Sequence, residues 1–361
     1  MEKENIKFVD GEKKILKKTK SKKKFIFLIC IFIFYIIIIL SAFLFYKILY
    51  LNHTLKHFKS FYENKINDLY NNISFYQEML KLYIENITEF YIKGRERTMK
   101  LYGKNYNESN INTIQDKLNW LIIHDNPVNK TNIVDKILLH EYSKKILGKD
   151  ICVPILKIYN NSNEIDLNEL PDKFVLKCNH GSGMNILCNN KSKLNISNVK
   201  YYLNKWMNTN YGLNSFEYQY INIKKKIFAE KYLCDNIKDY KVYCFNGYPK
   251  FIRVQEALPN ISGKINNYYN LEWNLNDIET GIGNYFIRRP DIIFKKPKYL
   301  NLMIEYAKKL SSQFFFVRVD FYEFENTVYL GELTFTPSNI IFNNKNINQS
   351  LYLGNLLNIS K

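Results

Sequence analysis

The segment that most constrains this chain is a run of 22 residues without a charge, from Phe25 to Tyr46. At about 1.5 Å of rise per residue the run would form about 33 Å of helix, which spans a hydrocarbon core about 30 Å thick. It has no polar stripe, as a buried core helix would, and no clear small-residue cleavage site, as a signal peptide would. We therefore expect residues 25–46 to form a transmembrane signal-anchor.

The charges beside this run predict its orientation. Residues 1–24 contain ten lysines and four acidic residues, whereas residues 47–70 carry a net charge of only +2. Positively charged flanks stay in the cytoplasm. Residues 1–24 should therefore form a basic cytoplasmic tail. The rest of this single-pass type II membrane protein should lie in the lumen of the Golgi or the endoplasmic reticulum.

The N-x-S/T sequons agree with this orientation. The chain has eleven, against about four expected from its content of Asn, Ser and Thr. Such an excess is typical of a glycosylated chain of the secretory pathway. The sequons begin at Asn52, Asn72, Asn86, Asn107, Asn129, Asn160, Asn190, Asn195, Asn260, Asn348 and Asn358.

The net charge of +18 would also suit a protein that binds nucleic acid. A net +6 of that charge lies in residues 1–24, and the rest is scattered among Asn, Ile and Tyr without a recognisable nucleic-acid-binding motif. We therefore expect no nucleic-acid partner.

Residues 47–114 are expected to form a helical stem. Apolar residues recur in steps of three and four between Leu55 and Ile87, which is the period of a helix. Two interpretations remain open: a coiled coil that joins two copies as a homodimer, or a helix that packs on the domain behind it.

From about residue 115 the sequence changes to short strand-like runs separated by sharp turns. Three hairpins are predicted, with turns at 180–183, 246–247 and 325–326, and helices are predicted over 132–146 and 297–312. Strands and helices do not alternate as in a doubly wound sheet. We expect an α+β domain over 115–342, followed by a C-terminal tail over 343–361.

The last predicted hairpin brings acidic residues together. If its turn is centred on Asn326, Asp320 faces Glu332 and Arg318 faces Thr334, all on one side of the sheet. The opposite side then carries the apolar residues Val317, Val319, Phe321, Leu333 and Phe335. Opposed carboxylates repel, so they need a counter-charge, which Arg318 and a bridging Mg²⁺ would supply. The alternative is a solvated outer face.

The first predicted hairpin has the composition of a phosphate-binding turn. A strand ends near Lys177, and His180, Gly181, Ser182 and Gly183 follow it as a flexible turn whose N–H groups can surround phosphate oxygens. An ordinary hairpin with a surface lysine is the alternative.

The cysteines of this hairpin leave two alternatives. Centred on Gly183, the hairpin would place Cys178 opposite Cys188, so that the two could form a disulfide in an oxidising lumen. Small buried thiols are the other interpretation.

Seven segments occur in an order that resembles the TupA-like (teichuronopeptide-biosynthesis) ATP-grasp family. The similarity covers residues 115–342 and is more specific than any single segment. The segments are Asp135-Lys136, Val153-Pro154, LPDKFVLKCNHGSGMN (170–185), AEKYL (229–233), DYKVYCFNG (239–247), RVDFY (318–322) and GELTFTP (331–337).

The resemblance implies two α+β subdomains that hold ATP between them. It implies that Lys136 and Lys177 bind phosphates, that His180, Gly181, Ser182 and Gly183 form the loop over them, and that Glu230, Tyr232 and Leu233 form the adenine-reading hinge. It further implies that Lys241 lines the nucleotide cleft, that Arg318 faces phosphate, and that Asp320 and Glu332 bind Mg²⁺.

This chain departs from the family's pattern in two places. Thr334 stands where many ATP-grasp enzymes have Asn, and residues 51–112 do not read as an N-terminal substrate domain.

The resulting expectation is an ATP- and Mg²⁺-dependent ligase that forms an acyl phosphate and modifies a glycan or a cell-surface polymer. A glycosyltransferase-like enzyme or a sugar kinase that uses the same cleft is the alternative, as is a non-catalytic, membrane-anchored binding protein.

The orientation can be tested by glycosylation. If residues 51–361 lie in the lumen, the protein expressed in a eukaryotic cell should lose apparent mass when N-glycans are removed enzymatically. An unshifted band, together with digestion of the C-terminus by protease added to intact microsomes, would contradict the type II orientation.

Overall fold

The computed structural model describes short helical stretches between residues 72 and 100, and then residues 110–125, 127–215, 217–257, 263–278, 286–337 and 347–360. The predicted tail and anchor, residues 1–46, and most of the predicted stem lie outside the described residues. Within the described residues, no helix is long and apolar enough to cross a membrane. The chain divides into two compact units, residues 1–81 and 82–361, and the elements below belong to the second.

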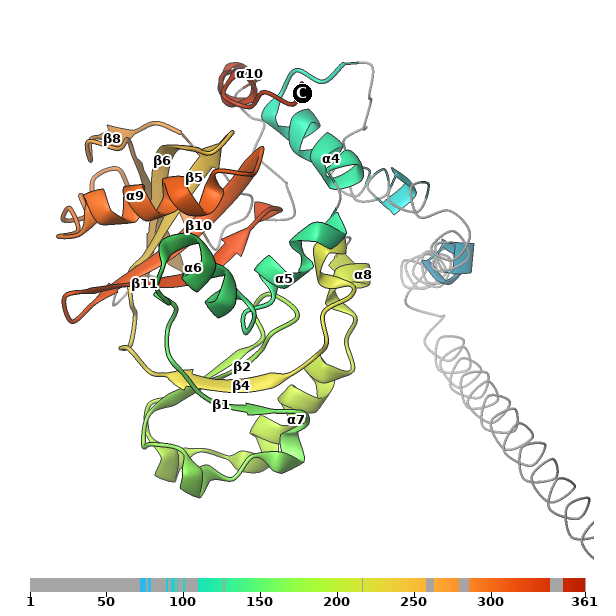
Figure 1. The fold of residues 1–361 in the computed structure, drawn as a ribbon, viewed down its shortest axis with the longest axis vertical. Helices are drawn as coiled ribbons and strands as arrows, with labels where there is room; N and C mark the ends of the chain where they lie inside the picture. Colours follow the sequence, from blue (N-terminus) through green and yellow to red (C-terminus); the bar gives the residue numbers. More distant parts are fainter. Residues whose placement is uncertain are drawn as a thin grey trace, which may run out of the picture. The chain divides into compact units, whose positions relative to one another are not determined.

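The second unit contains two separate sheets (Figure 1). The smaller has four antiparallel strands in the order β1-β4-β2-β3, with β1 Ile155–Tyr159, β2 Phe174–Cys178, β3 Asn185–Cys188 and β4 Ile227–Lys231. The larger runs β11-β10-β5-β6-β7-β8, and β9 pairs with β7. Its strands are β5 Asp239–Phe245, β6 Tyr248–Glu256, β7 Lys264–Tyr269, β8 Leu275–Asn276, β9 Phe286–Ile287, β10 Phe316–Phe324 and β11 Thr327–Thr334. The α+β class is therefore confirmed.

Helices cover one face of each sheet (Figure 1). The α-helices are α4 Ile114–His124, α5 Thr131–Val134, α6 Leu139–Leu147, α7 Ile196–Met207, α8 Tyr211–Ser215, α9 Leu300–Ser311 and α10 Ile347–Asn355. Short 3₁₀ turns lie at Pro127–Lys130, Ser162–Glu164, Leu167–Glu169, Lys191–Lys193 and Tyr218–Tyr220. The apolar side of α7 packs on the smaller sheet, α9 packs on the larger one, and α6 packs against α9. The other face of the larger sheet remains available for polar side chains.

The hairpin of β10 and β11 has the predicted facing pairs. Asp320 pairs with Glu332 and Arg318 with Thr334, while the five predicted apolar residues are buried in the core on the opposite side. The turn, however, is not centred on Asn326: Glu325 and Asn326 form a two-residue loop, both at positive φ, and Phe324 pairs with Thr327. A β-bulge between Asp320 and Phe321 then shifts the register by one residue.

The other two predicted hairpins, β2–β3 and β5–β6, also form. Between β5 and β6, the Asn246-Gly247 turn joins Phe245 directly to Tyr248, with both turn residues at positive φ.

The helix predicted over 132–146 is wrong as a single element. The chain leaves helical geometry at Asp135, which separates α5 from α6. The Asp135 carboxylate accepts hydrogen bonds from the N–H of Ile137 at 2.8 Å and from the side-chain amide of Asn179 at 2.9 Å. A side chain that bonds its own backbone two residues on competes with helix formation, which explains the break.

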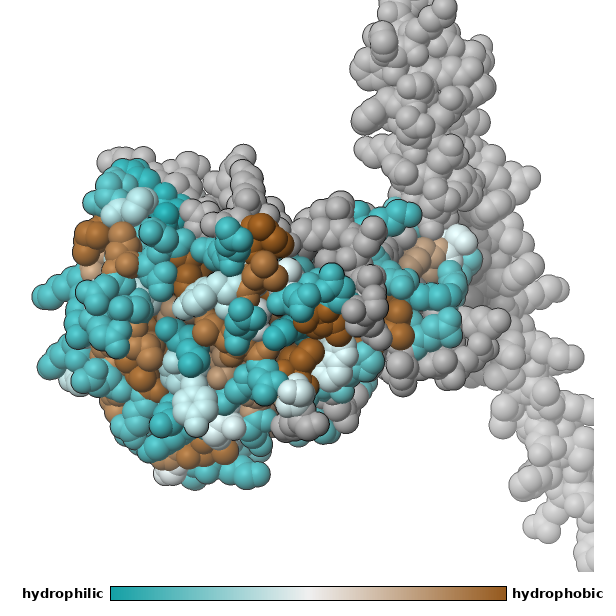
Figure 2. All heavy atoms as spheres, turned by 90° about the horizontal axis from the view of Figure 1, so that it is seen from above, coloured by the Kyte–Doolittle hydropathy of each residue, from teal (hydrophilic) through white to brown (hydrophobic). Residues whose placement is uncertain are grey.

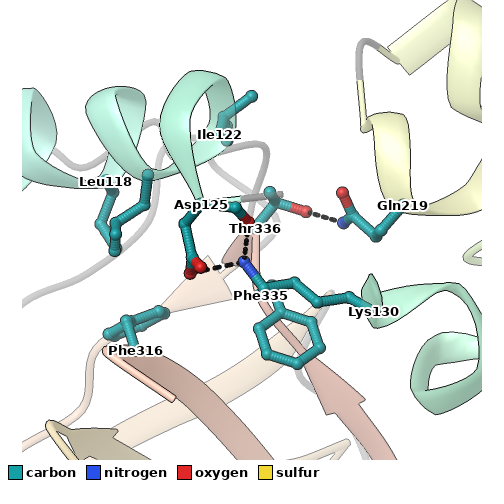
Figure 3. Close-up of a pocket in the computed structure, with 9 residues that line it drawn as sticks. Leu118, Ile122, Asp125, Lys130, Gln219, Phe316, Phe335 and Thr336 are labelled. Atoms are coloured by element: carbon teal, nitrogen blue, oxygen red, sulfur yellow. Dashed lines mark hydrogen bonds and ion pairs between the residues drawn. The ribbon is translucent and has the colours of Figure 1, made fainter. Parts of the chain in front are cut away.

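Strand-like runs were expected from residue 115, but α4 is a helix. Thr113 and Asp116 form a capping box: the Asp116 N–H donates to Thr113 Oγ1 at 3.2 Å, and the Thr113 N–H donates to the Asp116 carboxylate at 3.1 Å. Leu118 of this helix points toward Phe316 of the larger sheet (Figure 3), and both line one pocket with Ile122 and Phe335.

The segment predicted as a tail over 343–361 contains α10, which packs against α4. Lys117 Nζ on α4 donates to the carbonyl oxygens of Gly354 at 2.8 Å and Leu357 at 2.7 Å.

Figure 2 shows one face of the molecule, where hydrophilic side chains are interspersed with smaller hydrophobic areas, as on most water-exposed surfaces.

The facing position assumed for a disulfide between Cys178 and Cys188 is wrong. Cys188 pairs with Phe174, four residues before Cys178, because the hairpin is centred on Gly181 rather than Gly183. At about 3.3 Å per residue the two cysteines are on the order of 13 Å apart along the strand, beyond the roughly 7 Å that a disulfide spans. Both thiols are free.

Alkylation can test the state of the thiols. We expect the native protein, kept without reductant at pH 8, to react first at half-buried Cys234, because burial raises the pKa of the Cys178 and Cys244 thiols to about 12. After unfolding, Cys152, Cys178, Cys188 and Cys244 should all become labelled. Recovery of a disulfide-linked peptide pair that contains Cys178 and Cys188 would contradict the observed register.

Candidate functional site

The two predicted metal ligands lie side by side on the polar face of the larger sheet. Asp320 on β10 pairs with Glu332 on β11 and, on its other side, with Lys241 on β5. Directly paired residues project from the same face, so the two carboxylates and the ammonium group form one row across three strands.

The Arg318 guanidinium holds both carboxylates. Its Nε and Nη2 each donate to one oxygen of Asp320 at 2.6 Å, and Nη2 also donates to Glu332 Oε1 at 2.9 Å and to Thr334 Oγ1 at 3.0 Å. Lys241 Nζ donates to Asp320 Oδ2 at 2.6 Å. Asp320 is 1% exposed, so these charge-assisted bonds replace the water that it loses. The counter-charge predicted at Arg318 is therefore confirmed.

The positive charges around Glu332 keep it ionised. Burial would raise the pKa of Glu332, but Lys136, Arg318 and Lys241 outweigh burial and hold that pKa well below its usual range. Burial lowers the pKa of Lys136, and the charge of Glu332 opposes that change. Lys136 and Glu332 are therefore close enough to interact electrostatically.

On the smaller sheet, Lys177 and Glu230 form an ion pair. Lys177 lies on β2, two residues beyond Val175, which is the direct partner of Glu230 on β4. The two charged side chains are therefore diagonal neighbours on one face. In this structure the Glu230 carboxylate is engaged by a lysine.

The glycine-containing loop follows β2. Ser182 and Gly183 are exposed, whereas the side chain of His180 is buried beneath the loop and its Nε2 hydrogen-bonds the Trp206 carbonyl at 3.0 Å. The His180 ring therefore anchors the loop to the end of α7, and the exposed part of the loop is mainly backbone.

Lys136 reaches this loop from the break between α5 and α6. Its Nζ donates to the Gly181 carbonyl at 2.6 Å. The buried amide of Asn179 fixes the break to the smaller sheet, since it donates to Asp135 at 2.9 Å and accepts from the Lys226 N–H at 2.8 Å. The helix break is therefore what brings Lys136 to the loop.

A cavity of about 190 Å³ joins residues from both sheets. Four of the residues predicted to bind the nucleotide line this cavity: Lys177, Glu230, Tyr232 and Leu233. The larger sheet contributes Asp239, Lys264 and Tyr322. A smaller cavity lies among Lys136, Lys177, Glu230 and Gly331, beside the bulge of β11.

Four predicted site residues do not line either of these two cavities: the charged row of Asp320, Glu332 and Lys241, and Arg318, which binds the two carboxylates of that row. His180, Ser182 and Gly183 do not line them either.

Sequence reasoning missed three residues of this region. The Oδ1 atom of Asp239 is buried and has no hydrogen-bond partner among the described residues, although Asp239 opens the recognised DYK motif. Buried Arg253 pairs with Lys241 and extends the charged row onto β6. Tyr220 lies about 6.0 Å from Lys136 Nζ, measured to the ring centroid, and no local motif marks it.

Several solved structures are similar to parts of this chain. An N5-carboxyaminoimidazole synthetase from Staphylococcus aureus is 18% identical, with a TM-score of 0.29, and the match covers 56% of this chain and 44% of that one. A D-alanine–D-alanine ligase from Bacillus anthracis complexed with ATP is 12% identical, with a TM-score of 0.33 and 64% of each chain covered. Another structure of the Bacillus anthracis ligase is 17% identical, with a TM-score of 0.37. That match covers 70% of this chain and 76% of the other. The chain thus spans less than two thirds of the length of the first two.

No curated protein matches this chain. The model of the TupA-like ATP-grasp family matches residues 116–358, which is more than half of the sequence and extends past the predicted end of the domain through α10. The chain therefore belongs to the TupA-like ATP-grasp family.

Proposed function

We propose that this protein is an ATP- and Mg²⁺-dependent ligase that activates a carboxylic acid as an acyl phosphate and transfers the acyl group to an amine or a similar nucleophile. The observation that carries the proposal is the meeting of two sets of groups. Lys136 donates to the glycine-containing loop and shares a small cavity with Lys177, and Glu332, which faces Asp320, is close enough for its charge to act on Lys136. Membership of the ATP-grasp family supports this reaction type.

The cavity between the sheets is the proposed nucleotide site. Tyr232 and Leu233, after the end of β4, provide a wall for the adenine, and Lys177 lies at the same cavity for the phosphates. Asp239 supplies a buried carboxylate oxygen without a partner among the described residues. Such an oxygen favours a hydroxyl donor, and the two hydroxyl groups of a ribose provide one.

The donor set of the charged row fits Mg²⁺. Asp320 and Glu332 are hard oxygen ligands, and the hydrogen bonds that Glu332 receives from the described residues end on Oε1, which leaves Oε2 for a cation. Thr334 adds a hydroxyl, a weaker ligand than the Asn of many relatives. When bound, the ion neutralises charge on the ATP phosphates.

The chemistry proceeds in two transfers. An oxygen of the acid attacks the γ-phosphorus of ATP, the bond to the β-phosphate oxygen breaks, and acyl phosphate and ADP form. The nucleophile then attacks the acyl carbon, and inorganic phosphate leaves. Lys136, Lys177 and the loop N–H groups stabilise the charge of the transferring phosphoryl group, while Arg318 and Lys241 hold Asp320 and Glu332 in place.

The proposed acceptor is a glycan or a cell-surface polymer, modified in the lumen of the Golgi or endoplasmic reticulum by a protein anchored through residues 25–46. The charge step across that segment and the excess of sequons support this setting. The sequon residues Asn129, Asn160 and Asn195 have exposed side chains, as glycan attachment requires.

Removal of Lys177 should weaken ATP binding. We expect Lys177→Ala to raise the Kd of Mg²⁺-ATP about ten- to a hundredfold, because a charge-assisted contact contributes roughly 1.5–3 kcal/mol. Lys157→Ala is the matched control, since Lys157 lies on the same sheet and pairs with Glu169, but its side chain is 39% exposed against 18% for Lys177. Equal Kd values for wild type and Lys177→Ala, measured by titration calorimetry, would remove the loop and its lysine from the site.

Trapping with hydroxylamine tests the reaction. The full-length protein, given Mg²⁺-ATP, hydroxylamine and a panel of uronic and amino acids, should release inorganic phosphate and form an acyl hydroxamate with its acid substrate. The double variant Asp320→Asn, Glu332→Gln should lose both products.

Other outcomes separate the alternatives. Phosphate transferred to a sugar hydroxyl without hydroxamate would indicate a sugar kinase. Thermal protection by a sugar nucleotide with Mn²⁺, and not by ATP, would indicate a glycosyltransferase. Protection by neither nucleotide would indicate a non-catalytic binding protein.

A further inference from the structure

The glycine loop rests on the ring of Tyr211, the first residue of α8. A Cβ atom on Gly181 would lie 2.8 Å from Cγ of that ring, closer than side chains normally pack. Glycine at this position therefore allows the backbone of the loop to lie directly on the tyrosine. The position of the loop consequently depends on how Tyr211 is held.

Tyr211 is held by a buried carboxylate. Its hydroxyl donates to Glu217 Oε1 at 2.7 Å, and Glu217 is 6% exposed. Burial and the charge of Glu217 raise the pKa of Tyr211 well above its usual range, so the phenol remains a proton donor. The backbone of Tyr211 is also held, because the Ser215 hydroxyl donates to its carbonyl oxygen at 2.7 Å.

The same carboxylate is bound to the chain that follows β11. The Thr336 hydroxyl donates to Glu217 Oε2, and Gln219 Nε2 donates to the Thr336 hydroxyl at 2.8 Å (Figure 3). Thr336 lies two residues beyond Thr334, whose hydroxyl accepts from Arg318 and donates to Glu332. Glu217 thus connects the glycine loop to the segment that carries the metal carboxylate Glu332.

A second contact holds the loop from the other side. Lys136 Nζ donates to the Gly181 carbonyl, and its ammonium lies about 6.0 Å from the centroid of the Tyr220 ring. That ring meets Tyr211 edge-on at 5.2 Å between centroids. The two groups that hold the loop, the Tyr211 ring and Lys136, are therefore connected through the contact between Tyr211 and Tyr220.

We propose that Tyr211, Glu217 and Thr336 are positioning residues that fix the glycine loop at a set distance from Asp320 and Glu332, and so determine how tightly the phosphates of ATP bind. This inference rests on the proposed ATP-dependent function. A loop of Gly and Ser has many backbone conformations in isolation, and ordering it in advance lowers the entropy lost on binding. The network acts on the phosphate end of the nucleotide, since none of its three members lines the cavity proposed for the adenine.

Single-atom changes can test the network. Tyr211→Phe keeps the ring under Gly181 and removes only the hydroxyl, and Thr336→Val removes the hydroxyl at the other end. Each should raise the Kd of Mg²⁺-ATP about three- to tenfold, as expected for the loss of a hydrogen bond. The affinity for adenosine, measured by competition, should stay unchanged. Tyr202→Phe is the control, because Tyr202 is exposed on α7.

The double variant decides between positioning and simple packing. Because both hydroxyl groups act through Glu217, Tyr211→Phe combined with Thr336→Val should weaken ATP binding by less than the product of the two single effects. If the variants lower only the melting temperature, or weaken adenosine as much as ATP, the residues are structural and the inference fails. Absence of ATP binding by the wild type would instead refute the proposed function itself.

Discussion

Asp320 and Glu332 face each other on neighbouring strands, and the rest of the site depends on how their repulsion is relieved. Like charges in directly paired positions destabilise a sheet, and the near-complete burial of Asp320 adds a desolvation cost. Arg318 and Lys241 offset both the repulsion and the desolvation cost through short charge-assisted hydrogen bonds to Asp320. Removal of one partner from such a buried network costs about 3–5 kcal/mol, because the remaining charges lose their compensation. These four residues therefore behave as one unit.

Irregular backbone positions the groups around that unit. The bulge before Phe321 aligns Asp320 with Glu332, and Gly331 at the bulge leaves room for the ring of Tyr322, which a Cβ would approach to 2.8 Å. The break at Asp135 turns Lys136 toward the glycine loop. Both irregularities interrupt regular elements at the places where side chains from different parts of the chain must meet.

The facing carboxylates were predictable from the sequence, although the turn assumed for them was wrong. A two-residue turn at Glu325-Asn326 would by itself place Asp320 opposite Gly331, and the bulge restores the facing pair. The hairpin of β5 and β6 has a similar shift between Tyr243 and Cys244, which sets Lys241 beside Arg253. The alternation of apolar and polar residues predicts which face of a strand is buried. It does not predict where a β-bulge shifts the pairing register by one residue.

Local chemistry in the sequence by itself indicated the strands of three hairpins, the approximate places where they turn, the apolar face of the last hairpin and the family to which the chain belongs. These features depend on residues close together in the chain, such as Asn246-Gly247, or on motifs in a fixed order. The tertiary structure alone decided that Lys177 pairs with Glu230, that Cys178 and Cys188 are apart, and that Glu217 connects Tyr211 with Thr336. Glu217 and Thr336 are 119 residues apart in the chain, and Lys177 and Glu230 lie on strands that are not consecutive in the chain, so no local preference encodes these contacts.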